Sequence, residues 1–156
     1  MPLLNYTTTV EAAKTVFQIQ AILQTHGARS VLINYDAQGQ IEALSFLVKT
    51  PQGEIPIKLP VNPDAVLALL ERAWRAGRIR KRIDRSQAIR IAWRIVKDWV
   101  EAQMAILETE MVRMEQIFLP YVQTPDGRTV YERLEGAKFL QLNQGVNEIE
   151  EVERRL

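Results

Sequence analysis

The sequence predicts an α+β domain in which a three-stranded antiparallel meander packs against helices, one of them long and in the C-terminal half of the chain. Two observations predict this fold class. The spacing of apolar residues changes along the chain from a helical period of about 3.6 to a strand period of about two, and then back. Turn residues such as Pro, Gly, Asn and Asp separate the strand-like segments closely enough for neighbouring strands to pair antiparallel.

The length and composition of the chain are those of one ordinary globular domain. It has 156 residues, of which 47% are hydrophobic and 25% are charged, values that indicate neither disorder nor a fibrous repeat. We expect a single domain over residues 1–134 and a C-terminal tail over residues 135–156. The end of that tail, from Asn147 to Leu156, is expected to form an acidic helix.

Composition also limits the cellular location and the kinds of chemical site that we expect for the protein. The chain contains no cysteine, which excludes disulfides, thiolate chemistry and Cys-ligated metals. No segment approaches the roughly 20 apolar residues that a membrane span requires, and the N-terminus lacks the basic and apolar regions of a signal peptide. We therefore expect a soluble, cytoplasmic protein without a membrane partner.

The first helix is predicted to follow Thr8-Thr9-Val10-Glu11, which has the form of a capping box. Apolar residues then recur at helical spacing at Ala12, Val16, Ile19 and Leu23. Gly27 suits the left-handed conformation that ends many helices. His26 is the only histidine, and we expect it to interact with the last carbonyls of this helix rather than to act in catalysis.

Three strands are predicted after this helix, because the period changes to two. Their expected ranges are Val31–Tyr35, Ile41–Lys49 and Glu54–Leu59. Turn residues lie between them. Pro56 has no backbone N–H to donate, so the third strand is expected at an edge of the sheet.

Asn62-Pro63-Asp64 predicts the start of a second helix, with Asn as the N-cap and Pro at the first helical position. This helix is expected to end near Gly77. The residues from Arg78 to Arg82 then form a short basic connector. Asp84-Arg85-Ser86-Gln87 resembles a further capping box and predicts that another helix follows.

The longest helix is predicted from Arg85 to Phe118, because Pro120 interrupts it. Its apolar stripe is spaced by sevens at Trp93, Val100, Leu107 and Met114. Tryptophans on apolar stripes are usually core residues, and we expect this of Trp74, Trp93 and Trp99. A further short helix is predicted from Arg128 to Leu134.

Half of the positive charge lies in one short window of the chain. Between Arg72 and Lys97 there are ten of the twenty Lys and Arg residues and one acid, Asp84, a formal charge of +9 in a chain of net charge +1. Burying unpaired cations is very costly, so these side chains must stay in water or meet an anionic partner. The candidate phosphate-binding residues are Arg72, Arg75, Arg78, Arg80, Lys81, Arg82, Arg85, Arg90, Arg94 and Lys97.

The first function hypothesis is non-catalytic binding of nucleic acid, because cations that neutralise phosphates release condensed counterions. A single strand, and DNA in particular, is favoured over a duplex, since no recognition helix for the major groove is identifiable. Tyr35 and Phe46 are candidate platforms for stacking unpaired bases if they point outward from the sheet.

The second hypothesis is a homo-oligomeric adaptor that pairs through its long helix. Arg90, Arg94 and Lys97 share one face of that helix. An acidic stripe continues this face at Glu101, Glu108 and Glu115. Helix dipoles favour the reverse order of charge, but two antiparallel copies would place each basic stripe against an acidic one. A third possibility is a solvated charged face with no binding role.

No enzymatic, cofactor or metal site is predicted. The chain lacks a P-loop, a G-x-G-x-x-G fingerprint, an H-E-x-x-H helix and a G-x-S-x-G elbow. Asp98/Glu101 and Glu108/Glu115 could bring carboxylates together for Mg²⁺, but such spacing is routine on solvated helices. We therefore expect neither a metal nor another cofactor.

Two stretches, Tyr6-Thr7-Thr8-Thr9 and the segment from Ala92 to Met104, resemble an uncharacterised family of small phage or prophage proteins. The resemblance covers most of the chain to about Leu134. The family has no established activity, so the resemblance assigns no role to any residue. It implies a part in DNA transactions such as phage replication or recombination, which genes of this kind often serve.

Overall fold

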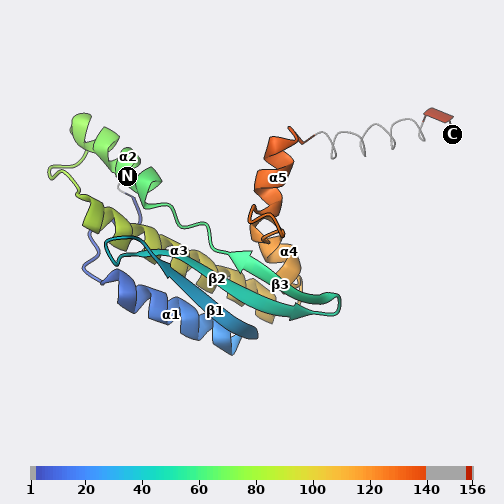
Figure 1. Cartoon of the computed structure of the whole chain (residues 1–156). Helices are drawn as coiled ribbons and strands as arrows, with labels where there is room; N and C mark the ends of the chain where they lie inside the picture. The colour runs from blue at the N-terminus through green and yellow to red at the C-terminus, as the bar shows by residue number, and fades with distance from the viewer. Residues whose placement is uncertain (1–2, 140–153, 156) are drawn as a thin grey trace.

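A three-stranded antiparallel sheet with the order β1-β2-β3 lies at the centre of the fold (Figure 1). The structure is a computed structural model that describes residues 3–139 and 154–155. The strands are β1 (Ala28–Tyr35), β2 (Ile41–Thr50) and β3 (Gly53–Lys58). The predicted meander is therefore confirmed, and so is the edge position of the strand that contains Pro56.

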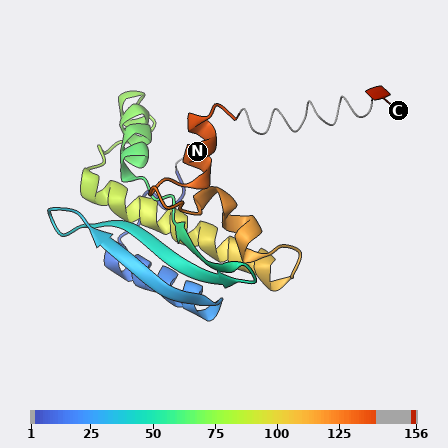
Figure 2. The same cartoon turned by 45° about the vertical axis from the view of Figure 1, so that its right-hand side comes forward.

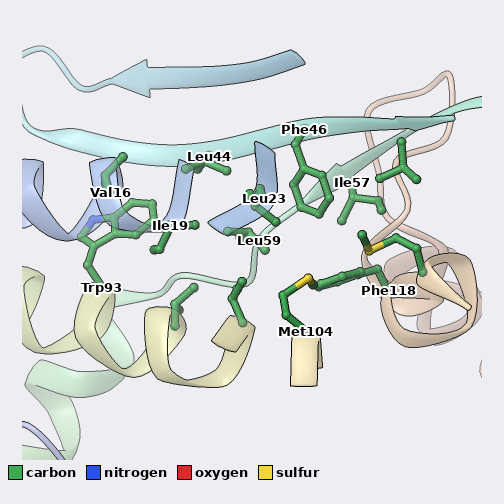
Figure 3. Packing of buried hydrophobic residues seen from close by; sticks show 14 of the residues in the cluster. Val16, Ile19, Leu23, Leu44, Phe46, Ile57, Leu59, Trp93, Met104 and Phe118 are labelled. Carbon is green, nitrogen blue, oxygen red and sulfur yellow. The ribbon is translucent and has the colours of Figure 1, made fainter. Parts of the chain in front are cut away.

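Two helices, α1 (Ala12–Thr25) and α3 (Arg85–Glu108), form one hydrophobic core with the sheet. Figure 3 shows Phe46 of β2 pointing toward Met104 of α3, with Trp93 beside Val16. A large apolar side chain that becomes fully buried stabilises a fold by about 1.5–3 kcal/mol. This arrangement confirms the predicted α+β class.

The remaining helices lie at the two ends of α3 (Figure 2). Helix α2 (Pro63–Arg75) packs against α3 near its start. The elements that follow α3 are α4 (Met114–Phe118), the 3₁₀ turn η1 (Leu119–Tyr121) and α5 (Val130–Gly136). Between η1 and α5 the chain passes along β3, where the N–H of Gln123 donates to the carbonyl of Pro56 at 2.8 Å. This contact covers part of the outer edge of β3.

Side-chain caps set the starts of α2 and α3 where the sequence predicts them, and the start of α5 two residues after the predicted Arg128. Asn62, Asp84 and Thr129 each accept a hydrogen bond from the backbone N–H three residues later, at 3.1, 2.8 and 3.2 Å. Each such cap contributes about 1 kcal/mol. The predicted C-terminal cap of α1 is also confirmed, because Gly27 has φ +97°.

The prediction of one continuous helix from Arg85 to Phe118 is wrong after Glu108. Helix α3 ends at Glu108, and Glu110 then adopts φ 60° as the chain turns toward α4. The cause is burial of Phe118, whose ring meets that of Phe46 edge-on at a centroid distance of 5.4 Å. A straight helix would carry Phe118 about 15 Å beyond Glu108 and out of this core.

The capping box predicted at Thr8 is also absent. Helix α1 begins at Ala12, and its N-cap, Glu11, makes no side-chain cap bond. The Thr8 hydroxyl instead accepts from the N–H of Val10 at 3.2 Å. The segment before α1 is held by contacts with α3, described below, and these override the local signal.

The predicted acidic helix from Asn147 to Leu156 lies outside the described residues, apart from Arg154 and Arg155, which are helical. Helix α5 continues to Gly136, past the boundary at residue 134 that we expected between domain and tail. That division stays a prediction. No helix within the described ranges combines the length and hydropathy needed to cross a bilayer.

Candidate nucleic-acid interface

Part of the basic segment between Arg72 and Lys97 lines a pocket of about 580 Å³. One wall is the N-terminal segment Tyr6–Thr9, and the other is the connector Arg78–Asp84 with Gln87 and Arg90 of α3. We call this site the basic pocket. Its cationic residues are Arg78, Arg80, Lys81, Arg82 and Arg90. Against these five cations the lining contains one carboxylate, that of Asp84, so the pocket favours an anion.

Gln87 joins the two walls of the basic pocket. Its Nε2 donates to the carbonyl oxygens of Tyr6 at 3.1 Å and Thr8 at 2.9 Å. Its Oε1 accepts from Nε of Arg90 at 2.9 Å. One side chain therefore fixes the N-terminal segment to α3 and also orients a guanidinium group that lines the pocket.

A second contact anchors the same segment further along α3. The amide of Asn5 donates to a carboxylate oxygen of Asp98 at 2.8 Å. Asn5 itself has φ 62°, a left-handed conformation that Asn adopts more readily than most residues. The two anchors bring the Thr7–Thr9 hydroxyl groups to the basic connector, and hydroxyls can donate to phosphate oxygens.

Three cations of the pocket have no ion pair with any described residue: Arg78, Arg80 and Lys81, all of which are exposed. They follow one another in the connector between α2 and α3. Because no carboxylate of the described residues holds them, their charge is available to a ligand. Arg72 is likewise exposed and unpaired among the described residues, on the last turns of α2.

Other cations between Arg72 and Lys97 have partners within the protein. Arg85 pairs with Asp64, whose hydrogen bond and charge raise the pKa of the guanidinium group. Arg94 donates to Gln18 of α1 at 2.7 Å. The side chain of Lys97 is only 15% exposed and lies 2.8 Å from Glu101. Arg85, Arg94 and Lys97 thus serve contacts within the fold.

Trp74 and Arg82 form a stacked pair at the end of α2. The guanidinium carbon of Arg82 lies 5.3 Å from the ring centroid of Trp74, within the range of a cation–π interaction. Glu71 accepts from Nε of Arg82 at 3.0 Å and also pairs with Arg75 at 3.4 Å. Trp74 remains 37% exposed, so its predicted place in the core is wrong.

The two residues predicted to stack bases lie in different environments. Phe46 is 2% exposed and points into the core, so its predicted role as a stacking platform is wrong. The cause is the register of β2, which places Phe46 opposite Val31 and Ile57 on the covered face of the sheet. Tyr35 is 60% exposed, at the end of β1.

The acidic stripe predicted on the long helix is divided by the turn after Glu108. Glu101 pairs with Lys97 in the same chain, and Glu115 belongs to α4. Glu108 accepts from His26 Nε2 at 3.0 Å, and this bond, with a second from Nδ1 to the Ile22 carbonyl, raises the pKa of His26. Pairing of two long helices therefore stays a prediction, and these internal contacts do not favour it.

The expected contact between His26 and the end of α1 is confirmed by its bond to Ile22, 2.7 Å long. The carboxylates considered for Mg²⁺ have other partners, since Asp98 binds Asn5 and Glu101 binds Lys97. Within the described ranges, no group of three or more His, Cys, Asp or Glu side chains is placed to hold a metal ion.

Comparisons of the chain with models of protein families, with curated proteins and with solved structures gave no match. Sequence reasoning identified the cationic side of the basic pocket, but it missed the other wall. The Thr7–Thr9 segment, the bridging role of Gln87 and the exposure of Trp74 all depend on contacts between distant parts of the chain. A count of charges along the sequence gives no signal for them.

Proposed function

We propose that this protein binds single-stranded nucleic acid, more specifically single-stranded DNA, at the basic pocket and catalyses no reaction. The observation that carries the proposal is the grouping of unpaired cations with hydroxyl groups in one concave site. Arg78, Arg80 and Lys81 would neutralise backbone phosphates, and Thr7–Thr9 would donate hydrogen bonds to phosphate oxygens. Such contacts provide affinity without reading sequence.

The packing of α3 favours a single strand over a duplex. A recognition helix must present a free face to the major groove, but α3 is packed by α1, α2 and the sheet. Its cations Arg85 and Arg94 also hold internal partners. The connector is a short, irregular basic segment beside a pocket, which suits a flexible strand better than a rigid duplex.

The exposed ring of Trp74 also favours a single strand over a duplex. It is the exposed aromatic ring nearest in sequence to the connector, and Arg82 stacks on it. Stacking of an unpaired base on an aromatic side chain is worth about 1–3 kcal/mol. Trp74 therefore takes the platform role that the sequence had suggested for Phe46.

A cytoplasmic location and a part in phage DNA replication or recombination belong to the same proposal. The first is supported by the absence of cysteine, which fits a reducing compartment. The second is supported only by the resemblance of Tyr6–Thr9 and of the Ala92–Met104 segment to small phage proteins.

Titration of a labelled oligonucleotide at several salt concentrations tests the proposal. If three phosphates are neutralised, log K falls linearly with log salt with a slope of about −2, since each contact on a single strand contributes about −0.7. A duplex of the same sequence should bind more weakly, and replacement of Trp74 by Ala should lower single-strand affinity. Absence of binding at low salt would reject nucleic acid as the ligand.

A further inference from the structure

The outer edge of β1 has no partner strand within the described ranges. In the sheet order β1-β2-β3, this strand pairs with β2 alone. Figure 1 shows β1 along one side of the sheet, with α1 beside it. An unpaired edge exposes a row of backbone N–H and C=O groups, which can pair with a strand of another chain.

The central part of this edge lacks the features that usually prevent such pairing, although irregularities in the register with β2 lie at both of its ends, at Ala28/Ser30 and Asn34/Tyr35. From Ser30 to Asn34 the register with β2 is regular, and the segment contains neither a charge nor a proline. Leu32, at its centre, is 61% exposed. Proteins that remain monomeric commonly protect their edges with charged residues, prolines or bulges. The central part of β1 is open to another strand.

The surface of α1 beside this edge is also uncharged. Ala13, Phe17 and Ala21 recur at intervals of four and are all exposed, so they form one stripe. Phe17 is 71% exposed, the largest exposed fraction among the large hydrophobic residues of the described chain. A stripe of two small residues around one aromatic ring can pack against a second copy of itself.

A groove of about 310 Å³ lies between α1 and the edge of β1. It is lined by Phe17, Gln20, Ala21 and Gln24 on the helix and by Ala28, Arg29, Ser30 and Val31 on the strand. The edge, the stripe and the groove are contiguous. Together they form a surface with an open backbone and an apolar centre, and the lining of the groove contains one charged side chain, that of Arg29, which also lies 4.0 Å from Glu54.

We propose that two copies of the protein associate through this surface, with β1 paired antiparallel to β1 about a two-fold axis at Leu32. This register pairs the residues from Ser30 to Asn34, where β1 is regular, and it keeps each side chain on its own face of the joined sheet. Leu32 of one copy lies opposite Leu32 of the other. The two sheets become one continuous sheet.

Side-chain chemistry supports a second copy as the occupant. The register brings Val31 of each copy opposite Ile33 of the other and Ser30 opposite Asn34, so apolar side chains face apolar ones, polar side chains face polar ones, and no charges face one another. The rise per residue along α1 and along β1 places Phe17 at about the same height as Leu32, close to the two-fold axis. Phe17 of one copy would then pack against the Ala13–Ala21 stripe of the other.

Sedimentation over a concentration series tests the interface. Wild type should form a dimer, and Leu32→Lys should raise its dissociation constant at least about tenfold, because two lysines would then face each other at the axis. Leu32→Glu should have the same effect. Since each residue at the axis opposes itself, a mixture of the two variants should form heterodimers as Lys meets Glu.

Leu119→Lys provides the matched control, because Leu119 is also exposed but lies in η1. It should dimerise like wild type. Circular dichroism should show that both Leu32 variants remain folded, as expected for an exposed position. A wild type that stays monomeric, Leu32 variants that dimerise as tightly as wild type, or a mixture that fails to form heterodimers would each overturn the proposal.

Discussion

Gln87 uses its whole side-chain amide within one small region of the structure. Both donated bonds end on backbone carbonyls of the N-terminal segment, and its oxygen accepts from Arg90. Since carbonyls of a partly buried segment need donors, losing one side chain would leave two acceptors unpaired. Gln87 thus positions one wall of the basic pocket, and under the proposed function it would act on the nucleic acid only through that wall.

Replacement of Gln87 by Glu should destabilise the protein by about 1–3 kcal/mol, because the carboxylate can still accept from Arg90 but can donate to neither carbonyl. Urea denaturation measures this change. Gln52→Glu, at an exposed position in the turn between β2 and β3, introduces the same charge and should have little effect. Equal stability of the two variants would show that the Gln87 bonds do not hold the segment.

His26 predicts how stability depends on pH. Its pKa is raised above the ordinary 6.5, first by the hydrogen bond to Glu108 and then by that to Ile22. Its contribution is therefore fully present below the unfolded pKa and is lost as pH rises through the folded pKa. The carboxyl of Asp126 does not contribute to this loss of stability, because the Thr124 hydroxyl and Arg128 lower its pKa.

We expect the urea midpoint of wild type to fall as the pH rises above the ordinary histidine value of 6.5, and to fall less in Glu108→Ala, which removes the main cause of the raised pKa. Glu135→Ala removes an exposed carboxylate from α5 and should keep the wild-type profile. If Glu108→Ala retains the full decline, the bond to His26 is not its source.

At the scale of elements, the turn between α3 and α4 places the C-terminal part of the domain. It brings the buried ring of Phe118 against Phe46 and within a centroid distance of 5.6 Å of Trp99. Trp99 in turn meets Tyr121 of η1 at 5.5 Å. Edge-to-face pairs of this kind contribute about 0.5–1.5 kcal/mol each beyond their burial.

Phe118→Ala should lower the free energy of unfolding by about 3–5 kcal/mol, because it leaves a cavity between α4, β2 and α3. Chemical denaturation checks this value. Leu119→Ala, at the adjacent exposed position, should change stability by less than about 0.5 kcal/mol. Similar effects at the two positions would contradict the packing of α4 against the sheet.

Most elements of the fold could be predicted because their signals are local. Asn62 and Asp84 mark helix starts by their own side-chain chemistry, and Gly27 and Pro56 act through the backbone. The turn after Glu108 could not be predicted, because residues 109–113 contain no Gly or Pro. Burial of Phe118, a contact distant in sequence, determines it.

At the scale of the whole molecule, the same distinction applies to the site. The cations of the connector are adjacent in sequence, so a count of charges finds them. Whether a cation is paired within the protein depends on partners such as Asp64 and Gln18, which lie far away along the chain. The sequence therefore does not show which cations are paired. The contact between Thr8 and Gln87 spans 79 residues and leaves no local pattern.

The molecule therefore carries two distinct surfaces. One is the basic pocket, where Arg78, Arg80 and Lys81 are free to bind an anion. The other is the uncharged edge of β1 with its neighbouring stripe on α1, which is suited to a second copy of the chain. Because the surfaces share no residue, a change in one can be tested without altering the other.

The most direct test of the account is reversal of the three free cations, Arg78→Glu, Arg80→Glu and Lys81→Glu, measured by oligonucleotide titration at low salt. We predict a loss of single-strand affinity of at least about a hundredfold, since three phosphate contacts become repulsions. The matched control reverses three exposed cations outside the pocket, namely Lys49 on β2, Arg133 on α5 and Lys138 just after α5. Equal losses in the two proteins would contradict a specific role for the basic pocket, because net charge alone would then explain binding.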